Sequence, residues 1–253
     1  MTSGPVTLDA QQLRARVGDH PFVRWEIAPD LLREAWAWGE ATAFLRQRHF
    51  NRRIGMNVLG PLGDVDRLLG LLAQRGLPSE VSSLSVERGA LAAAERHFDL
   101  LPGGDWDWMW TTTLPPVLPG EALLVPLNDS ADARDILALN EIGNPTAESR
   151  PGEGVTEAWV GVREDGRLLG AAAMHRTGAG APHLVGIVVH PDARGRGLGA
   201  AMTASLTRRA VESDGVCTLG MYAHNDVARR LYHGLGYTTA VEWASRSLSP
   251  KRQ

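Results

Sequence analysis

The chain has 253 residues, of which 43% are hydrophobic and 22% charged, and its formal net charge is −3. A slightly acidic chain gives no electrostatic basis for nucleic acid or an anionic membrane as the main partner, and no apolar run approaches the length of a membrane-spanning helix. A single cysteine, Cys217, excludes an intrachain disulfide. Together with a polar start that lacks a signal-peptide pattern, it predicts a cytoplasmic protein.

The spacing of apolar residues in the first half of the chain predicts alternating strands and helices. The clearest is an amphipathic helix capped by Asp64 and ended by Gly76. The other predicted helices are Ala10–Val17, Pro29–Ala37 and Glu87–Phe98, and the predicted strands are Ala41–Arg46, Arg53–Leu59, Val81–Val86 and Trp106–Thr113. In the last strand Trp106, Trp108 and Trp110 alternate, so we expect them on one face, within the core of this half.

A proline-rich segment, Thr113–Gly120, is the predicted linker, because three prolines and a glycine disfavour both a helix and a central strand. After it the patterns predict strands at Ala122–Leu127, Ala158–Arg163, Leu168–His175, Ala181–Val189, Val216–Tyr222 and Tyr237–Leu248, and helices at 131–143, 200–213 and Asn225–Leu235. The irregular loop Asn144–Gly154 is of the kind that shapes a pocket. The fold class expected from this order is α/β with a mixed sheet.

The second half contains a glycine turn between a strand and a helix. Leu184–Val189 is apolar and β-branched, which predicts a buried strand, and residues 190–193 end it. Arg194–Gly199, with the sequence RGRGLG, leads into the helix, so backbone N–H groups and the positive end of the helix dipole converge there. Glycines let a ligand approach the backbone closely, and Arg194 and Arg196 add positive charge. The sequence therefore predicts a phosphate or pyrophosphate site.

Two patterns in this half resemble the motifs of the GCN5-related N-acetyltransferase (GNAT) family: an arginine-glycine motif behind a strand that ends in Val-His-Pro, and a downstream N-x-x-A-x-x-L-Y segment. The residues that carry the resemblance are Arg194, Gly197, Gly199, Asn225, Ala228, Leu231, Tyr232, Gly236 and Tyr237. Tyr237 stands where the family usually has phenylalanine. The resemblance covers the second half only, and it implies the GNAT fold there.

By this resemblance the chain would bind acetyl-CoA as its acyl donor and would need no metal. The strand residues implied to contact the pantetheine arm through their backbone are Ile187, Val188 and Val189. The residues implied for the pyrophosphate are Arg194, Gly195, Arg196, Gly197, Leu198 and Gly199. Asn225 would hydrogen-bond the pantetheine. Tyr232 lies two helical turns after Asn225, on the same helix face, and would be the general acid for the CoA sulfur.

The general base is less well defined. Aligned on Val-His-Pro, His183 takes the place at which many relatives carry a glutamate that activates the amine. Histidine titrates near neutrality and could accept a proton, and by the two-residue period of a strand His183 would share a face with Ile187. A surface histidine beside Pro182 fits the residues equally well. Glu157, His175 or a chain of water molecules are the alternatives.

The glycines also fit a second motif. Gly195, Gly197 and Ala200 satisfy the G-x-G-x-x-A fingerprint of dinucleotide sites, with Asp226 beyond the next strand. That fingerprint places its first glycine directly after a strand near the start of a domain, so the GNAT pattern describes this chain better. No Gly-Lys-Ser/Thr follows, which excludes a P-loop. A tight turn without a ligand is the remaining alternative.

The order of predicted elements in the first half resembles the order around the glycine motif. We therefore expect a degenerate GNAT-like domain in residues 1–120 and a catalytic GNAT domain in residues 121–253. In the first half the counterpart of the pyrophosphate loop, Gly60–Asp64, lacks the arginine and the glycine spacing. The carboxylate of Asp64 would repel an anionic ligand, so the first domain is expected not to bind CoA.

The function expected from these features is an acetyl-CoA-dependent N-acetyltransferase. It would act on a primary amine of a small molecule, such as a metabolite or an antibiotic, by direct attack in a ternary complex. A CoA-binding sensor without turnover, an enzyme that acetylates protein N-termini or lysines, and a nucleotide-dependent oxidoreductase are the alternatives. We expect a small-molecule partner, no nucleic acid and no membrane, and we leave a homodimer open.

Overall fold

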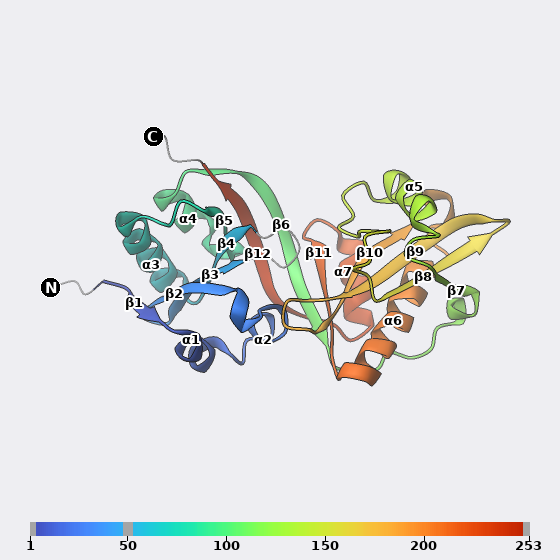
Figure 1. Ribbon diagram of the computed structural model, residues 1–253, viewed down its shortest axis with the longest axis horizontal. Helices are drawn as coiled ribbons and strands as arrows, with labels where there is room; N and C mark the ends of the chain where they lie inside the picture. Colours follow the sequence, from blue (N-terminus) through green and yellow to red (C-terminus); the bar gives the residue numbers. More distant parts are fainter. Residues whose placement is uncertain (1–3, 48–52, 250–253) are drawn as a thin grey trace.

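A computed structural model of the protein describes residues 4–47 and 53–249. The molecule is elongated, with two lobes joined by one twelve-stranded sheet (Figure 1). The strands are β1 (Val6–Leu8), β2 (Leu32–Trp38), β3 (Ala41–Gln47), β4 (Ile54–Leu59), β5 (Val81–Glu87), β6 (Leu100–Thr111), β7 (Leu124–Leu127), β8 (Ala158–Glu164), β9 (Arg167–Arg176), β10 (Pro182–Val189), β11 (Cys217–Tyr222) and β12 (Thr238–Leu248). The α-helices are α1 (Ala10–Val17), α2 (Pro21–Glu26), α3 (Leu62–Arg75), α4 (Leu91–His97), α5 (Ala133–Gly143), α6 (Leu198–Asp214) and α7 (Asp226–Gly234). No helix within the described residues is long and apolar enough to cross a membrane.

The sheet has the same arrangement when followed inward from either edge. Its strand order is β1-β2-β3-β4-β5-β12-β6-β11-β10-β9-β8-β7. Counted from the two edges, β1 to β5 therefore correspond to β7 to β11, and the sixth positions are taken by β12 and β6. Among its neighbouring strands β4 with β5 and β10 with β11 are parallel, and the other pairs are antiparallel. The predicted α/β fold with a mixed sheet is confirmed. We call β1–β5 with α1–α4 the first lobe, and β7–β11 with α5–α7 the second lobe.

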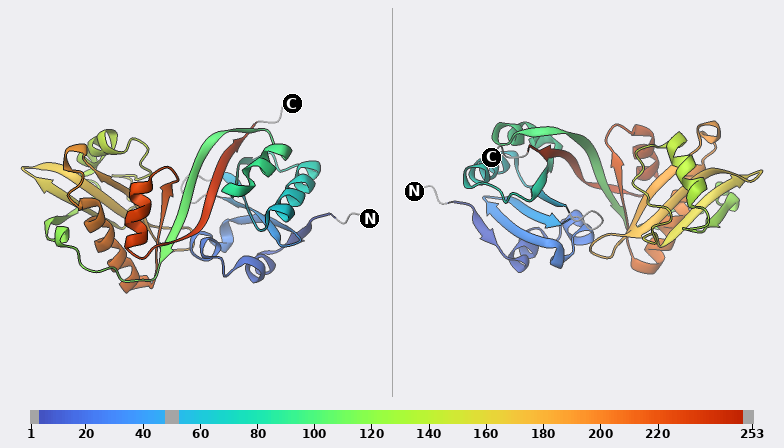
Figure 2. Two further views of the ribbon diagram at one scale, coloured as in Figure 1. Left: turned by 180° about the vertical axis from the view of Figure 1, so that it is seen from behind. Right: turned by 45° about the horizontal axis from the view of Figure 1, so that its top comes forward.

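Strands β6 and β12 are exchanged between the lobes. β12, the last strand of the chain, lies between β5 and β6, and β6 in turn pairs with β11 of the second lobe. The two long strands run side by side through the middle of the molecule (Figure 2). β12 places the fully buried Trp243 against Phe22 of the first lobe, with ring centroids 5.1 Å apart. The division into residues 1–120 and 121–253 stays a prediction. In the sheet, β6 of the first segment pairs with β11 of the second, and β12 of the second pairs with β5 of the first.

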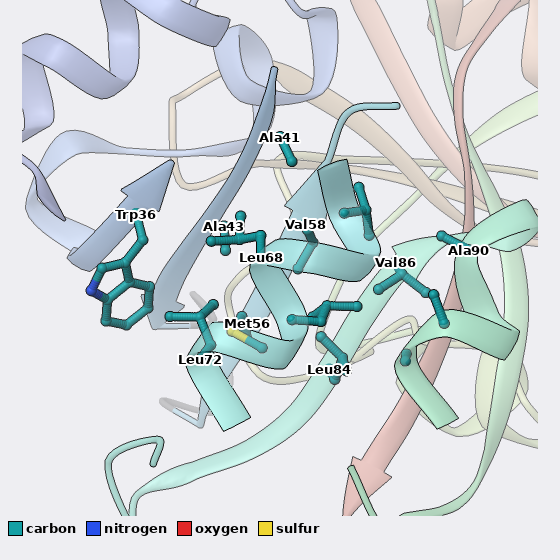
Figure 3. Packing of buried hydrophobic residues seen from close by; sticks show 14 of the residues in the cluster. Trp36, Ala41, Ala43, Met56, Val58, Leu68, Leu72, Leu84, Val86 and Ala90 are labelled. Carbon is teal, nitrogen blue, oxygen red and sulfur yellow. The ribbon is translucent and has the colours of Figure 1, made fainter. Parts of the chain in front are cut away.

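Helices cover both faces of the sheet in each lobe. In the first lobe α3 and α4 pack on one face, and α1 and α2 pack on the other. Figure 3 shows Leu68 and Leu72 of α3 packed against Met56 and Val58 of β4. Apolar residues three and four positions apart give α3 this buried stripe, and full burial of each leucine stabilises the fold by about 2 kcal/mol.

The tryptophans of β6 lie as the alternation predicts. Trp106, Trp108 and Trp110 all pack into the cluster beneath α1 and α2, together with Trp243 of β12. Trp108 is fully buried and meets the edge of Phe22 with ring centroids 5.6 Å apart. The face shared by the three indoles is therefore confirmed, and it forms the core between the first lobe and the exchanged strands.

Two local predictions in the first half are wrong. Residues Pro29–Leu31 form a single 3₁₀ turn, and the chain then enters β2 instead of the predicted helix Pro29–Ala37. Pairing with both β1 and β3 buries the side chains of residues 35–37 and outweighs their helix propensity. α3 starts at Leu62, so Asp64 is not its cap; its carboxylate instead accepts a hydrogen bond from the Glu40 N–H at 2.8 Å. Of the remaining predicted elements, the helix Ala10–Val17 is present with the predicted ends, and the others are present with shifted ends.

Cys217 is buried, as its place in an apolar strand predicts. The hydroxyl of Tyr237 donates to its Sγ at 3.1 Å. Burial raises the pKa of the Cys217 thiol to about 12, which keeps the sulfur protonated and unreactive at neutral pH.

Candidate functional site

The loop between β10 and α6 leaves open space in front of its glycines. β10 ends at Val189, a 3₁₀ turn follows at Pro191–Ala193, and α6 begins after Gly197. Gly195 and Gly197 have φ values of +78° and +74°, a left-handed backbone that strains any residue with a Cβ. A Cβ built on either glycine would meet no other protein atom within 4 Å. A ligand can therefore approach the backbone directly at both positions.

A run of backbone donors faces this space. In the described part of the chain the N–H groups of residues 195–200 make no hydrogen bond, whereas those of Arg194 and Ala201 bond to Pro191 O and Gly197 O. The first three N–H groups of α6 lack acceptors because they begin the helix, and no side chain caps it. Six consecutive free donors at the positive end of a 17-residue helix suit an anion. The geometry agrees with the predicted pyrophosphate loop.

The two arginines of the loop have partners within the protein. Arg194 donates to Gly143 O at 3.0 Å, which fastens the end of α5 to the loop. Arg196 forms an ion pair with Glu164 and lowers the pKa of that carboxyl group. Both members of this pair are exposed, so its net contribution to stability is small. The positive charges predicted at the rim are therefore present, but both arginines are already bonded to other groups of the protein.

Strands β10 and β11 separate after a short stretch of pairing. His183 pairs with Thr218 and Leu184 with Leu219, and the ladder stops there. In the first lobe the matching strands β4 and β5 stay paired from Ile54 to Val58. Beyond Leu184, the backbone edge of β10 that faces β11 has no strand partner, and this edge includes the predicted pantetheine contacts Ile187, Val188 and Val189. An extended, amide-containing ligand could pair with that edge.

A β-bulge lies at the point of separation. The register between β10 and β9 shifts between Val185 and Val188, and Gly186 has a φ of +58°. An extra residue in one strand reverses which side chains face each way. Leu184 and Ile187 therefore pack towards α6 and α7, whereas Val185 and Val188 pack towards α5. We call these sides of the sheet the α6–α7 face and the α5 face.

The bulge overturns one prediction about His183. By alternation His183 lies with Val185 on the α5 face, so it does not share a face with Ile187. Its ring stacks on that of His175 in β9, with centroids 5.3 Å apart. The Thr218 hydroxyl donates its only hydrogen to Pro182 O at 2.9 Å. His183 Nδ1 lies 2.8 Å from Thr218 Oγ1, so Nδ1 must be the donor in that contact. This tautomer leaves the lone pair on Nε2.

Burial lowers the pKa of His183 to about 4, so its ring is neutral at pH 7. A neutral ring with a free Nε2 can accept a proton, although so low a pKa makes it a weak base. Glu157, an alternative base, holds Arg176 through two hydrogen bonds of 2.5 and 2.9 Å. His183 therefore stays the predicted base, and the structure adds that burial keeps its pKa low.

The depressed pKa of His183 gives a testable pH dependence of stability. The unfolded chain binds more protons than the folded one between pH 6.5, the ordinary value, and about 4. The contribution of His183 to the free energy of unfolding is thus fully present above pH 6.5 and is lost as the pH falls towards 4. At pH 4.5 this loss is about 2.5 kcal/mol. Urea unfolding of the wild type and of His183→Gln at about pH 7 and pH 4.5 checks this. We expect a smaller difference between the two pH values in the variant; equal differences would contradict the assignment.

The second predicted motif lies on α7, on the α6–α7 face. Asn225 caps the helix, and its side-chain oxygen accepts from the Ala228 N–H at 3.1 Å. The predicted contact to pantetheine would therefore fall to the amide nitrogen of Asn225. Tyr232 is 7% exposed and belongs to the cluster under α6 and α7. Burial raises its pKa to about 12, so the phenol keeps its proton at neutral pH and can act as an acid.

The hydroxyl of Tyr232 is free in the described chain. It makes no hydrogen bond there. It is also not one of the fully buried polar atoms without a partner, so some of its surface remains accessible. The neighbouring Tyr237 differs, because its hydroxyl bonds both Thr207 and Cys217. The ring of Tyr232 is largely packed in the core, whereas its hydroxyl is left without a structural function.

Two contributors to the site, Gly186 and Thr218, were not predicted from the sequence, and the structure adds detail to a third. Gly186 forms the bulge, and a lone glycine in a β-branched strand is the signal that could have indicated it. Thr218 fixes the tautomer of His183, which only strand register reveals. Loop 144–157 lies across the separated strands: Ser149 packs on Gly186, and Tyr222 reaches Thr146 O at 3.4 Å. The part of it predicted to shape a pocket, Asn144–Gly154, contains Thr146 and Ser149, and their contacts place it beside the separated strands.

Comparison with known proteins identifies this region. Residues 131–237 match the model of the acetyltransferase (GNAT) family. This segment is a GNAT domain. Its match contains the glycine loop, the bulge, His183, Asn225 and Tyr232, and it ends immediately before the exchanged strand β12. The predicted family resemblance of the second half is confirmed. No curated protein matches the chain.

Solved structures extend the likeness of fold to nearly the whole chain. A GNAT-family protein from Novosphingobium aromaticivorans is 20% identical with a TM-score of 0.54, covering 94% of this chain and 96% of its own. A GCN5-related N-acetyltransferase from Kribbella flavida is 17% identical with a TM-score of 0.56, covering 96% of both chains. One from Sphaerobacter thermophilus is 21% identical with a TM-score of 0.57, covering 87% and 78%. At these identities the likeness concerns the fold, which here includes both lobes.

Proposed function

We propose that the chain is an acetyl-CoA-dependent N-acetyltransferase that acylates a primary amine of a small molecule. The observation that carries this is the combination, within the GNAT domain, of six free N–H groups at α6 and a neighbouring opening between β10 and β11. The free donors suit a diphosphate, and the strand edge suits the amide-rich pantetheine arm of CoA. No carboxylate side chain lies within the run of residues 194–200.

The same geometry divides the chemistry between two faces of the sheet. Tyr232 lies on the α6–α7 face as a protonated phenol, suited to deliver a proton to the departing CoA sulfur. His183 lies on the α5 face, where Nε2 could take a proton from the attacking ammonium, directly or through water. A backbone N–H freed by the bulge at Gly186 could stabilise the charge that develops on the thioester oxygen. The amine would then approach from the α5 face, beneath loop 144–157.

Within this proposal the first lobe does not bind the donor. Asp64 places its carboxylate in the first turn of α3, where the matching helix α6 has free N–H groups. Strands β4 and β5 remain paired, so no opening exists between them for pantetheine. A negative charge and a closed sheet both act against CoA at this position. The first lobe thus supports the site without duplicating it.

Replacing Tyr232 with phenylalanine tests the proposal. We expect kcat for acetyl transfer to fall by about 100-fold, with little change in the KM for acetyl-CoA, because only a proton transfer is lost. Release of CoA thiol over a panel of small primary amines and peptides measures both constants. Tyr237→Phe is the matched control, because it removes a hydroxyl from a ring 5.9 Å away in the same core and should retain kcat.

The outcomes separate the alternative functions. If kcat is unchanged in Tyr232→Phe, Tyr232 is not the general acid for the CoA sulfur. Binding of CoA by the wild type without thiol release on any amine indicates a sensor, and turnover on peptides alone indicates a protein acetyltransferase. A melting temperature raised by NAD(P)H but not by CoA would refute acetyl transfer altogether.

A further inference from the structure

A fully buried carboxylate lies between the two lobes, beneath α7. Asp107 is on β6, and its side chain has no exposed surface. Its Oδ1 lies 2.5 Å from a terminal nitrogen of Arg88, which begins the 3₁₀ turn Arg88–Ala90 of the first lobe. Its Oδ2 lies 3.1 Å from a terminal nitrogen of Arg229 on α7. One carboxylate therefore joins an arginine of each lobe.

The two arginines depend on this carboxylate to different degrees. Arg88 also pairs with Glu242 at 3.1 Å. Arg229 has one other carboxylate within 4 Å among the described residues, the exposed Asp226 at 4.0 Å. A buried carboxylate that loses its cation is strongly destabilising, because its charge is left without compensation. The contact between Asp107 and Arg229 is thus a close electrostatic link between α7 and the central strands.

Arg229 occupies the part of α7 that matters for the proposed chemistry. It follows the cap Asn225 by four residues and precedes Tyr232 by three, so the three side chains lie along one side of the helix. Arg229 also donates to Ala223 O, which holds the loop between β11 and α7. A shift of Arg229 would therefore move the cap and the phenol together.

We propose that Asp107 is a positioning residue that sets α7, and with it Asn225 and Tyr232, through Arg229. The inference rests on the proposed function for the role of Tyr232, but the placement of α7 can be measured without turnover. Asp107 comes from the half of the chain that lacks a donor site. The exchanged strand β6 thereby contributes to catalysis through one buried ion pair with α7.

The test compares Asp107→Asn with Arg88→Gln, which removes the other arginine from the same carboxylate. In Asp107→Asn we expect amide hydrogen exchange of residues 226–234 to rise at least tenfold and kcat to fall at least tenfold. In Arg88→Gln we expect both to stay within about twofold of the wild type, because the Asp107–Arg229 pair remains. Similar effects of the two variants would mean a general loss of stability and would overturn the proposal.

A double-mutant cycle distinguishes positioning from a structural effect. If Asp107 acts only by aligning the phenol, the double variant should be as active as Tyr232→Phe alone, so Tyr232→Phe should lower kcat by no more than about tenfold in the Asp107→Asn background. A loss as large as in the wild type would overturn the proposal. If Asp107→Asn does not fold, Arg229→Gln is compared with Arg229→Lys, which keeps the charge; equal kcat and equal exchange in these two variants would also overturn it.

The readouts separate this proposal from the proposed function. A wild type that acetylates no amine refutes acetyl transfer, whereas exchange of α7 and the affinity for CoA, measured by calorimetry, still decide whether Asp107 positions the helix. A wild type that turns over, with α7 unchanged in Asp107→Asn, refutes the positioning alone.

Discussion

Gly197→Glu should abolish the binding of CoA while the protein stays folded. A Cβ at this position points into space that no protein atom occupies within 4 Å, directly before the free N–H groups of α6. A carboxylate placed there would repel a diphosphate, yet it suits the positive end of the helix dipole. We expect the affinity for CoA, measured by calorimetry, to fall by at least about 100-fold, which corresponds to roughly 3 kcal/mol.

Gly215→Glu is the matched control, because Gly215 ends the same helix. Its φ is +73°, and a Cβ there also meets nothing within 4 Å. Both substitutions thus carry the same backbone strain, of about 1–2 kcal/mol. Gly215→Glu should bind CoA like the wild type. If Gly197→Glu also keeps its affinity, the loop is not the diphosphate site.

The segment 121–253 expressed alone should fail to fold cooperatively, although it contains the whole GNAT match. β11 would lose its neighbour β6, and β12 would lose both β5 and β6. Trp243, fully buried against Phe22, would be left without its core, and a loss of that kind costs about 3–5 kcal/mol. Near-UV circular dichroism and urea unfolding check this expectation. A sharp unfolding transition like that of the full chain would contradict it.

Cleavage of the intact protein in the linker provides the control for this experiment. Val117 is 72% exposed, so a protease site can be inserted beside it. The two pieces should stay associated after cleavage and should still bind CoA, because β6 and β12 remain paired. Both samples contain the segment 121–253, and they differ only in whether the first piece is present.

Local chemistry made the glycine loop between β10 and α6 predictable. A β-branched strand, a glycine turn with an arginine and a helix each have a signature within a few residues, and Arg194–Gly199 folds as those signatures indicate. The same holds for the amphipathic α3, whereas the capping role of Asn225 was not predicted. The match between the two halves was visible only as element order, and the sheet extends it to strand order.

Features that depend on strand neighbours were not predictable in this way. The helix expected at Pro29–Ala37 is mostly a strand because two other strands flank it. Alternation placed His183 on the wrong face because one bulge at Gly186 reverses the pattern. The tautomer of His183 depends on Thr218, which is 35 residues away in the chain. A contact between residues so far apart in the chain is not visible in the local spacing of residues.

The exchange of β6 and β12 bears on how the protein can change over time. A lobe that does not bind the donor, as we propose for the first lobe, would ordinarily be free to shrink or to be deleted. Here deletion of the first half of the chain, which includes β6, would remove the strand that pairs with β11 and the carboxylate of Asp107. Selection would therefore maintain the first lobe for the architecture it completes, and compensating changes for damage in β12 would arise in residues 100–111, more than 120 positions away in the chain.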